Sequence, residues 1–399
     1  MKKIVALLLS AIMTFMFILP GIAFEDGADA AKKRLAFRDD GKFTILQVAD
    51  IQDDAILSNL AKQSIRNAVE KSKPDLIMLT GDNIAGYSCG TKGLAKAALK
   101  AVMDLFEDIG VPVAAVFGNH DDDNTPYTKL EQIEQYETYS CYVGEKGVVC
   151  EASAGKNKTM NAGTYNLPIY DSKGSDKVAY NLWCIDSGNY NPDDTYGGYG
   201  YVMPEQVKWY VETSNALKAA NGGNPVPSIA FQHIAPPQIF KALKEVDKNT
   251  EGAVSHGGKY YVLPDGVDRE TNWMLEAPCP PELNFEPGYA EVDAMLEQGD
   301  VKAIFYGHDH MNHYIVPYEG IDLVSSAGLT FHSYNDDHRG FRVITLDKNN
   351  TDSFDSYYLS ATDLLENGST MDKISLGFKN FIDAIVNFFK GIWDKISNG

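Results

Sequence analysis

Side chains of the types that bind metal ions follow several apolar stretches of this chain. Val113 to Phe117 leads directly into Gly118-Asn119-His120-Asp121, which supplies an amide oxygen, an imidazole and a carboxylate. Apolar stretches elsewhere are followed in the same way by further ligand types, namely Asp50, Asp82, His233, His308 and His310. Carboxylate oxygen, amide oxygen and imidazole nitrogen together suit Mn, Fe, Zn or Co.

This set of donors is what two neighbouring divalent ions require. One carboxylate can bridge two ions, and two metals a few Å apart stabilise both the attacking and the leaving oxygen of a phosphoryl transfer. A single Gly-Asn-His-Asp or Gly-Asp-Asn sequence is more often a turn than a site. All the motifs in this order, each after an apolar stretch, instead favour a dinuclear centre that carries out phosphoryl transfer.

The elements that would position these residues alternate between strands and helices. Apolar, strand-like runs are expected over 43–48, 76–80, 113–117, 228–232 and 303–306. Amphipathic helices are expected over 58–72 and 94–109, between the first three of these strands. Such alternation predicts a mostly parallel sheet that forms half of a sandwich, and sheets of this kind carry their chemistry at the carboxyl ends of the strands.

The order of the motifs resembles that of the calcineurin-like metallophosphoesterases. The motifs that carry the resemblance are Asp50, Gly81-Asp82, Gly118-Asn119-His120-Asp121, His233 and Gly307-His308-Asp309-His310. Finer features are similar to the branch related to purple acid phosphatases that includes the Dcr2-like phosphatases, and these are Leu46 to Asp50, Asp186-Ser187-Gly188, Pro204 to Trp209 and Arg339 to Ile344. The resemblance implies an α/β fold in which residues 37–347 form a four-layer α/β/β/α sandwich of two mixed sheets.

The resemblance also implies a role for each motif residue. The implied metal ligands are Asp82 as the bridge, Asp50 and His310 on the first ion, and Asn119, His233 and His308 on the second. His120 is implied to be catalytic rather than a ligand, either contacting the phosphoryl group or protonating the leaving alkoxide, and Asn119 and His120 are the implied substrate-binding residues. A metal-bound hydroxide formed at neutral pH is a good nucleophile, and a nearby imidazole is a suitable acid.

Two positions depart from the pattern of the family. The family has His two residues after the first Asp, whereas this chain has Gln52, whose amide oxygen is a weaker ligand for borderline metals. The donor at this place in the first metal site is therefore open between Gln52, Asp53, Asp54 and water. Purple acid phosphatases carry a Tyr three residues after the second-motif Asp, and here that position is Ala85. We expect a divalent pair rather than a purple ferric centre.

The first residues of the chain are typical of a secretory signal peptide. Lys2 and Lys3 precede an apolar run over 4–19, and cleavage is expected after residue 23 or as late as residue 30. The alternative is an uncleaved anchor, although the run is shorter than the roughly 20 residues that a membrane span needs. We expect an exported protein, secreted or at the cell surface or periplasm. The net charge of −20 argues against nucleic acid as a partner.

The C-terminal part differs in composition from the domain before it. Residues 348–370 are polar and are expected to be a linker, and residues 371–397 carry apolar side chains at three- and four-residue spacing, as in an amphipathic helix. This helix could dock on the domain, mediate self-association or lie on a membrane surface. Long loops at 87–92, 187–200 and 247–287 are expected to face the substrate or to form a lid, and His332 is a candidate lining residue.

These observations predict an exported, metal-dependent phosphoesterase. We expect hydrolysis of a phosphomonoester of a small molecule by attack of a metal-bound hydroxide at a dinuclear centre. Phosphodiesterase or nucleotidase action on the same fold is an alternative that the ligand set does not separate. A second alternative is a non-catalytic protein that binds a phosphorylated ligand, with a first metal site weakened by Gln52.

Overall fold

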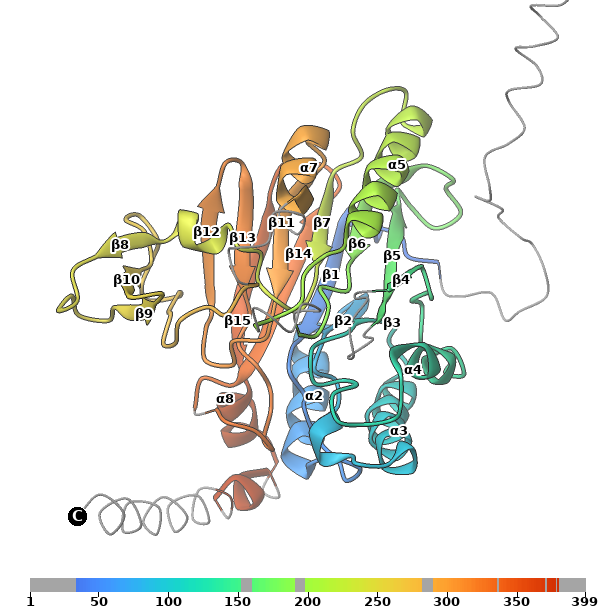
Figure 1. Cartoon of the computed structure of the whole chain (residues 1–399). Helices are drawn as coiled ribbons and strands as arrows, with labels where there is room; N and C mark the ends of the chain where they lie inside the picture. Colours follow the sequence, from blue (N-terminus) through green and yellow to red (C-terminus); the bar gives the residue numbers. More distant parts are fainter. Residues whose placement is uncertain are drawn as a thin grey trace, which may run out of the picture. The chain divides into compact units, whose positions relative to one another are not determined.

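Two β-sheets form the centre of the protein in the computed structural model (Figure 1). The structure describes residues 34–151, 160–190, 198–281, 290–335, 337–369, 372–377 and 379. The expected signal peptide, residues 1–23, and most of the expected C-terminal helix, residues 371–397, lie outside this part of the chain. None of the helices in the described residues combines the length and the apolar composition needed to cross a membrane.

The first sheet contains the strands that end in the early motifs. Its order is β15 (Phe354–Ser360), β14 (Gly340–Asp347), β1 (Lys42–Val48), β2 (Leu76–Thr80) and β3 (Val113–Val116). Strands β1, β2 and β3 are parallel, whereas β14 and β15 are antiparallel to their neighbours. The carboxyl ends of the three parallel strands therefore lie along one edge of the sheet.

The second sheet contains the strands that end in the later motifs. Its order is β12 (Tyr314–Tyr318), β13 (Ile321–Ser325), β11 (Val301–Tyr306), β7 (Ser228–Phe231), β6 (Val178–Cys184), β5 (Met160–Tyr170) and β4 (Val148–Glu151). Strands β13, β11, β7 and β6 are parallel, and the outer strands are antiparallel. One apolar cluster joins the sheets, since Ile45, Met78 and Ile344 of the first sheet pack with Leu182, Ile229 and Phe305 of the second.

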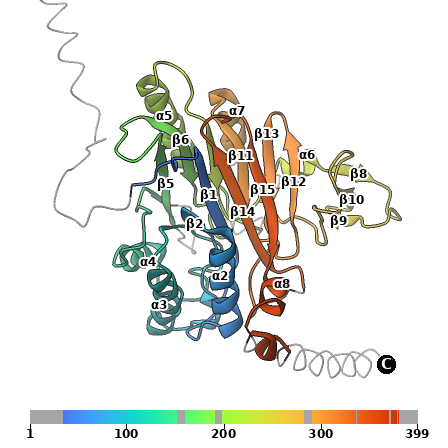
Figure 2. The same cartoon turned by 180° about the vertical axis from the view of Figure 1, so that it is seen from behind.

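Helices cover the outer faces of both sheets. The helices on the first sheet are α2 (Asn59–Ser72), α3 (Lys92–Ile109), α4 (Lys129–Tyr136) and α8 (Ala361–Glu366), and those on the second are α5 (Pro204–Ala220), α6 (Ile239–Ala242) and α7 (Ala290–Gln298). Figure 2 shows α2 and α8 side by side at one end of the first sheet. The predicted four-layer α/β/β/α sandwich of two mixed sheets is confirmed.

The helix starts follow from capping residues in the sequence. The side chains of Ser58 and Thr91 accept backbone N–H groups at the first turns of α2 and α3, and Thr128 and Glu131 form a capping box on α4. Gly110 ends α3 in the left-handed conformation, with φ of 76°. Helices α2 and α3 end shortly before β2 and β3, the strands that lead into Asp82 and Asn119.

The stretch that was expected to be a linker, residues 348–370, is part of the fold. It contains strand β15, which pairs with β14 from Phe354 to Ser360, and helix α8. Phe354 packs on the cluster between the sheets, while alternate residues of this edge strand are exposed. The polar composition that suggested a linker reflects this exposed face of an edge strand.

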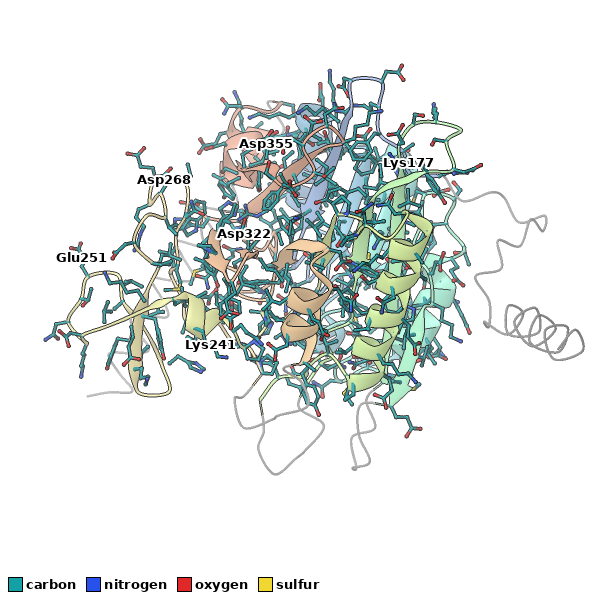
Figure 3. The ribbon with its side chains drawn as sticks, turned by 90° about the horizontal axis from the view of Figure 1, so that it is seen from above. Lys177, Lys241, Glu251, Asp268, Asp322 and Asp355 are labelled. Atoms are coloured by element: carbon teal, nitrogen blue, oxygen red, sulfur yellow. The ribbon has the colours of Figure 1, made fainter. Side chains whose placement is uncertain are left out.

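The segment 247–287, expected to be an irregular lid, contributes strands β9 (Val254–His256) and β10 (Lys259–Val262) to a small sheet whose third strand, β8 (Lys244–Val246), precedes it. The three strands pair antiparallel in the order β8, β10, β9. His256 stacks on the ring of Phe240 at 4.1 Å between centroids. In Figure 3, Glu251 and Asp268 project outward from this insertion, at its outer edge.

A buried ion pair joins α4 to the loop after β6. The Nζ atom of Lys129 donates to both carboxylate oxygens of Asp186 at 2.9 Å, and the two side chains are 1% and 0% exposed. Asp186 also accepts the N–H groups of Ala162 and Gly188. Loss of Lys129 would leave this carboxylate buried without its counter-charge.

Lys129→Met is therefore expected to lower the free energy of unfolding by about 3 to 5 kcal/mol. The matched control is Lys244→Met, because Lys244 pairs with Asp265 on the surface, where the side chains are 46% and 84% exposed. This exposed pair is expected to contribute no more than about 1 kcal/mol. Urea unfolding of both variants checks the difference, and equal losses would contradict it.

Candidate metal centre

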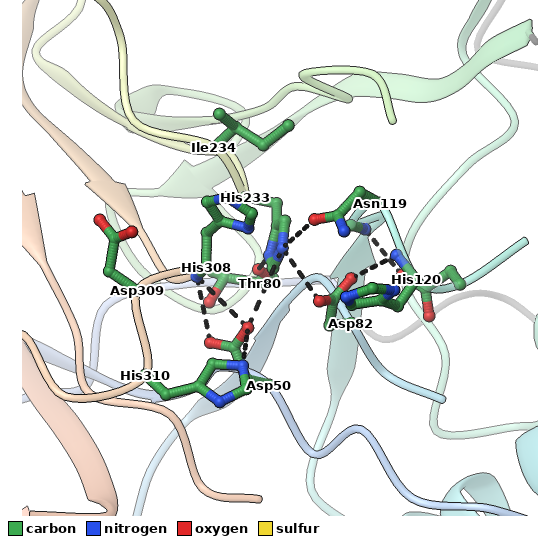
Figure 4. A network of polar contacts seen from close by, with 12 residues as sticks. Asp50, Thr80, Asp82, Asn119, His120, His233, Ile234, His308, Asp309 and His310 are labelled. Atoms are coloured by element: carbon green, nitrogen blue, oxygen red, sulfur yellow. Dashed lines mark hydrogen bonds and ion pairs between the residues drawn. The ribbon is translucent and has the colours of Figure 1, made fainter. Parts of the chain in front are cut away.

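The predicted ligands lie together at the carboxyl ends of strands from both sheets, as Figure 4 shows. Two groups of side chains place ligand atoms within 4.8 Å of one another: Asp82, His233 and His308 form one, and Asp50, Asp82 and His310 form the other. All of these residues are buried. Asp82 belongs to both groups, which is the position that a bridging carboxylate would take.

The first group is arranged around the imidazole of His233. Its Nε2 atom lies 3.3 Å from Asp82 Oδ2 and 3.2 Å from Asn119 Oδ1. On the other side of the ring, Nδ1–H donates to the carbonyl oxygen of Thr80 at 2.9 Å. This bond fixes the ring and directs Nε2 toward the oxygens, so these atoms converge where a cation would be stabilised.

The second group is held in a similar way. His310 Nε2 lies 3.6 Å from Asp50 Oδ1, and His310 Nδ1–H donates to the carbonyl oxygen of Tyr334 at 2.7 Å. The backbone N–H of His308 points at both oxygens of Asp50, at 3.3 and 3.2 Å. The hydrogen bonds from His308 to Asp50 therefore connect the loop after β1 to the loop after β11.

The backbone at the site is unusual for residues with side chains. Asp50, Gln52, Asp82 and His308 have φ of 52°, 43°, 50° and 72°. Positive φ is uncommon for residues other than glycine, and such strain gathers at functional sites. Glycine is required beside them, because a Cβ on Gly118 would lie 2.1 Å from Asp82 Oδ1 and one on Gly81 would lie 2.5 Å from the His233 ring.

Among the predicted ligand oxygens, Asp82 Oδ2 and Gln52 Oε1 are buried and accept no hydrogen bond within the described residues, although Asp82 Oδ2 lies 3.3 Å from His233 Nε2. A buried acceptor without a partner costs free energy, so both atoms favour a bound cation. Gln52 lines the same cavity as Asp82 and His310. The donor set thus fits divalent metal ions.

The other donors considered for the place of Gln52 are occupied locally. The carboxylate of Asp53 accepts the N–H groups of Asp54 and Ser58 at 3.0 and 2.8 Å. Asp54 accepts the N–H of Ile56 at 2.7 Å. Of the side chains left open by the sequence, Gln52 is therefore the one with an available oxygen at the cavity.

The pKa values of the ligand side chains reflect the burial of closely spaced charges. Burial raises the pKa of Asp50 to about 8. Burial opposes charge on His233 too, but the nearby Asp82 carboxylate raises the pKa of this imidazole to about 10. Burial lowers the pKa of His310 to about 4, which leaves that ring neutral. Metal ions must displace protons from Asp50 and His233, so metal affinity should rise with pH.

His120 lies beside the ligand groups without belonging to either. Its backbone N–H donates to Asp82 Oδ1 at 2.8 Å, and its side-chain Nδ1 lies 2.7 Å from Asp123 Oδ2. Burial lowers the pKa of His120, but the hydrogen bond to Asp123 and the charge of Asp82 raise it overall. The imidazole is 28% exposed and lines the cavity, so its Nε2 is available to a substrate.

Asp121, the last residue of the Gly-Asn-His-Asp motif, has a structural role. Its carboxylate accepts the N–H groups of Gly118 at 2.7 Å, Asn83 at 2.8 Å and Ile84 at 3.1 Å. These bonds tie the loop after β3 to the loop after β2. The motif therefore contributes a ligand candidate, an acid candidate and the residue that fixes the loops.

A cavity of about 350 Å³ opens onto this centre. Its lining consists of Gln52, Asp82, Tyr87, His120, Tyr199, Cys279, His308, Asp309, His310, Ser333 and Tyr334. All three lining tyrosines contact histidines, with ring centroids 5.0 Å apart for Tyr87 and His120, 4.3 Å for Tyr199 and His308, and 4.2 Å for Tyr334 and His310. His332 is not in this lining and instead approaches Ser88 Oγ at 3.2 Å.

All seven predicted metal-ligand candidates and His120 are thus brought together, while Asp123, Asp309 and Tyr334 were not among the predicted site residues. Asp123 follows His120 by three residues, and this spacing was the available signal. Tyr87 and Tyr199 fall in the segments 87–92 and 187–200, which were expected to face a substrate, whereas nothing in the sequence distinguished Tyr334.

Comparison with known proteins gives a consistent result. The model of the calcineurin-like phosphoesterase family matches residues 43–312. The chain is 29% identical over 334 residues to "Probable inactive purple acid phosphatase 14" of Arabidopsis thaliana, covering 77% of this chain and 75% of that protein. It is 25% identical over 304 residues to "Phosphatase DCR2" of Saccharomyces cerevisiae, covering 72% of this chain and 47% of that protein.

Among solved structures, a dimetal phosphatase from Danio rerio matches 80% of this chain and 99% of its own length, with a TM-score of 0.45 and 12% identity.

Proposed function

Since this chain belongs to the calcineurin-like phosphoesterase family, we propose that it hydrolyses phosphomonoesters at a centre of two divalent metal ions. The observation that carries the proposal is that Asp82 belongs to both groups of side chains whose ligand atoms lie within 4.8 Å of one another. Asp82 Oδ2, which is buried and lies 3.3 Å from His233 Nε2, supports the same proposal.

The proposed ligands divide between the two ions as follows: Asp50, His310 and Gln52 on the first, Asn119, His233 and His308 on the second, and Asp82 on both. Mn, Fe, Zn and Co all suit this set. When bound, two divalent ions activate water and neutralise the charge of the phosphoryl oxygens.

The protein side chains supply orientation and a proton. Thr80 and Tyr334 fix the rings of His233 and His310 through their carbonyl oxygens. Asp123 contacts Nδ1 of His120, which lines the cavity, and a proton at Nε2 could pass to the oxygen of the leaving alcohol. Asn119 and His120 are the proposed contacts to the phosphoryl group.

We also propose that the protein is exported, on the basis of the signal-like sequence of residues 1–23. Self-association or membrane-surface attachment through residues 371–397 stays a prediction. The acidic surface continues to argue against nucleic acid as a partner.

A second candidate is a non-catalytic protein that binds a phosphorylated ligand. Two observations favour it: Gln52 stands where the family has His, and the Arabidopsis relative carries the word inactive in its name. Against it, Gln52 Oε1 is an available acceptor at the cavity, and His120 with Asp123 would be unnecessary for binding alone.

Turnover of p-nitrophenyl phosphate and bis-p-nitrophenyl phosphate tests the proposal. Purified chain is stripped of metal and reloaded with Mn, Zn, Fe(II), Co, Ca or Mg, and bound metal is measured in parallel. We expect two ions per chain and metal-dependent turnover that is faster for the monoester. Faster turnover of the diester would favour the phosphodiesterase alternative. A single bound ion without turnover of either compound would overturn the proposal in favour of the phospho-ligand binder.

A further inference from the structure

The side chain of Asn119 can bind a metal ion only if its amide oxygen, rather than its amide nitrogen, faces the metal position. The nitrogen carries two hydrogens and can only donate. In the structure, Oδ1 lies 3.2 Å from His233 Nε2, as Figure 4 shows, whereas Nδ2 donates to the hydroxyl oxygen of Tyr190 at 3.3 Å. Asn119 is 1% exposed, so neighbouring protein groups rather than bulk water decide which end of the amide faces the metal position.

The hydroxyl of Tyr190 is itself oriented by a carboxylate. Its O–H donates to Asp123 Oδ2 at 3.3 Å, and the same oxygen lies 2.7 Å from His120 Nδ1. Burial raises the pKa of Tyr190, so the hydroxyl keeps this hydrogen throughout the neutral range. A carboxylate only accepts hydrogen bonds, so the hydrogen of Tyr190 is directed to Asp123 and its oxygen is left to accept from Asn119. The hydrogen bonds thus run in one direction, from Asn119 through Tyr190 to Asp123.

The position of Tyr190 is fixed by its neighbours. Asn189, which precedes it and is 5% exposed, donates through Nδ2 to Asp122 Oδ1. Two consecutive residues, Asn189 and Tyr190, therefore bond to two consecutive carboxylates, Asp122 and Asp123, in the loop after β3. The ring of Tyr190 stacks on that of Tyr199, with centroids 6.0 Å apart and an interplanar angle of 24°. These contacts hold the hydroxyl of Tyr190 at Asn119.

The same segment contacts another proposed ligand of the second ion. Tyr199 pairs with Tyr190 in an isolated antiparallel bridge, and its ring lies 4.3 Å from the ring of His308 between centroids. Tyr190 and Tyr199 thus contact Asn119 and His308, two of the side chains proposed to bind this ion. Groups that orient metal ligands typically contribute 10- to 100-fold to metal affinity or activity.

We propose that Tyr190 is a positioning residue for the second metal ion, and that its hydroxyl turns the amide oxygen of Asn119 toward that ion. This inference rests on the two-metal centre of the proposed function and adds a residue that acts through a ligand. Tyr190 is not among the described residues that line the cavity, so its effect passes through Asn119. Without the hydroxyl, the buried Nδ2 of Asn119 would lose its partner, and the amide would no longer be held in the orientation that binds metal.

Tyr190→Phe tests this inference, because it removes the hydroxyl and keeps the ring that stacks on Tyr199. The affinities of the full chain for its two ions are measured by competition with a chelating dye for Zn or Mn, and Asn119→Ala identifies which constant belongs to the second ion. We expect Tyr190→Phe to weaken that constant by about 10- to 100-fold. The constant of the first ion should stay unchanged, because other side chains are proposed to bind that ion.

A second variant, Asn119→Asp, removes the need for orientation, because either oxygen of a carboxylate can bind a cation. Adding Tyr190→Phe to Asn119→Asp should therefore have little effect on the second constant, whereas a loss of packing would weaken it in both backgrounds. The matched control is Tyr357→Phe, which removes a hydroxyl from a 48% exposed tyrosine on β15. Asp355→Asn, an exposed carboxylate on the same strand (Figure 3), controls for a change of one charge. Both controls should leave the two constants unchanged.

The outcomes separate this inference from the function on which it rests. Unchanged affinity for both ions in Tyr190→Phe, with metal-dependent turnover of p-nitrophenyl phosphate, would overturn the positioning role alone. An equal loss of affinity in the Asn119 and Asn119→Asp backgrounds would also overturn it. The expected coupling between Tyr190 and Asn119 without turnover of either nitrophenyl ester would support the positioning role and reject hydrolysis. A single bound ion in the unmodified chain, again without turnover, would reject both.

Discussion

Asp82→Ala is expected to lower kcat/KM for p-nitrophenyl phosphate by at least about 10³-fold. Asp82 is the residue that both groups of ligand atoms share, so its removal weakens both proposed metal positions at once. Loss of any other single ligand leaves one group intact. The backbone of Asp82 has φ of 50°, which alanine adopts less readily, so a second variant, Asp82→Asn, keeps the side-chain shape.

Metal binding provides a readout of this prediction that does not depend on activity. A ligand that binds only the folded protein stabilises it, by about 2.7 kcal/mol at a hundred times its Kd. We expect added metal to raise the melting temperature of the unmodified chain and to have little effect on either Asp82 variant. Metal content measured after desalting should fall in the same variants. Asp355→Asn should behave like the unmodified chain, and retention of both ions by Asp82→Ala would contradict a bridging role.

The strand ends could be predicted because buried strands are apolar in sequence, whereas the metal-binding residues that follow them are polar. Strands covered on both sides, such as β2 and β3, are continuous apolar runs, and the polar ligands that follow them stand out. The same contrast located His233 and His308, although they come from the other sheet. The edge strand β15 lacks this contrast, because exposed residues alternate with partly buried ones and only Leu359 is fully buried, and it was taken for a linker.

The groups around the ligands could not be predicted, because their role depends on contacts between distant segments. Tyr334 belongs to the site through its carbonyl oxygen, which accepts from His310, and through the stacking of its ring on the same residue. Neither contact follows from a local pattern. The motif shows where Asp309 is in the sequence. Its contacts, with Oδ1 accepting the N–H of Cys279 and Oδ2 having no hydrogen-bond partner among the described residues, follow only from the folded chain.

The geometry around Gln52 favours it as a donor at the first metal position. The sequence offered Gln52, Asp53, Asp54 or water at the first metal position. Local turns occupy the two aspartates through backbone N–H groups, and the left-handed backbone of Gln52, with φ of 43°, brings its side chain to the cavity. An amide oxygen is a weaker ligand than imidazole, so the first ion should be the more weakly bound of the two.

His120→Ala is expected to have a large effect that depends on the leaving group. If Nε2–H protonates the departing oxygen, turnover of phenyl phosphate should fall by about 10³-fold. Turnover of p-nitrophenyl phosphate should fall by less than about tenfold, because p-nitrophenolate is a weak base that leaves without a proton. Metal content should be retained, since His120 contacts Asp82 through its backbone N–H, which alanine also provides.

The dependence on Asp123 separates proton donation by His120 from simple binding of the phosphoryl group. The hydrogen bond from His120 to Asp123 raises the pKa of the imidazole, so the protonated acid persists to higher pH than in an isolated histidine. Asp123→Asn removes this charge, and the loss of activity on the alkaline side should then move to lower pH. Measured pH profiles of kcat for phenyl phosphate check this shift. Equal losses on both esters in His120→Ala, with no shift in Asp123→Asn, would mean that His120 stabilises the phosphoryl oxygens and that the leaving oxygen obtains its proton elsewhere.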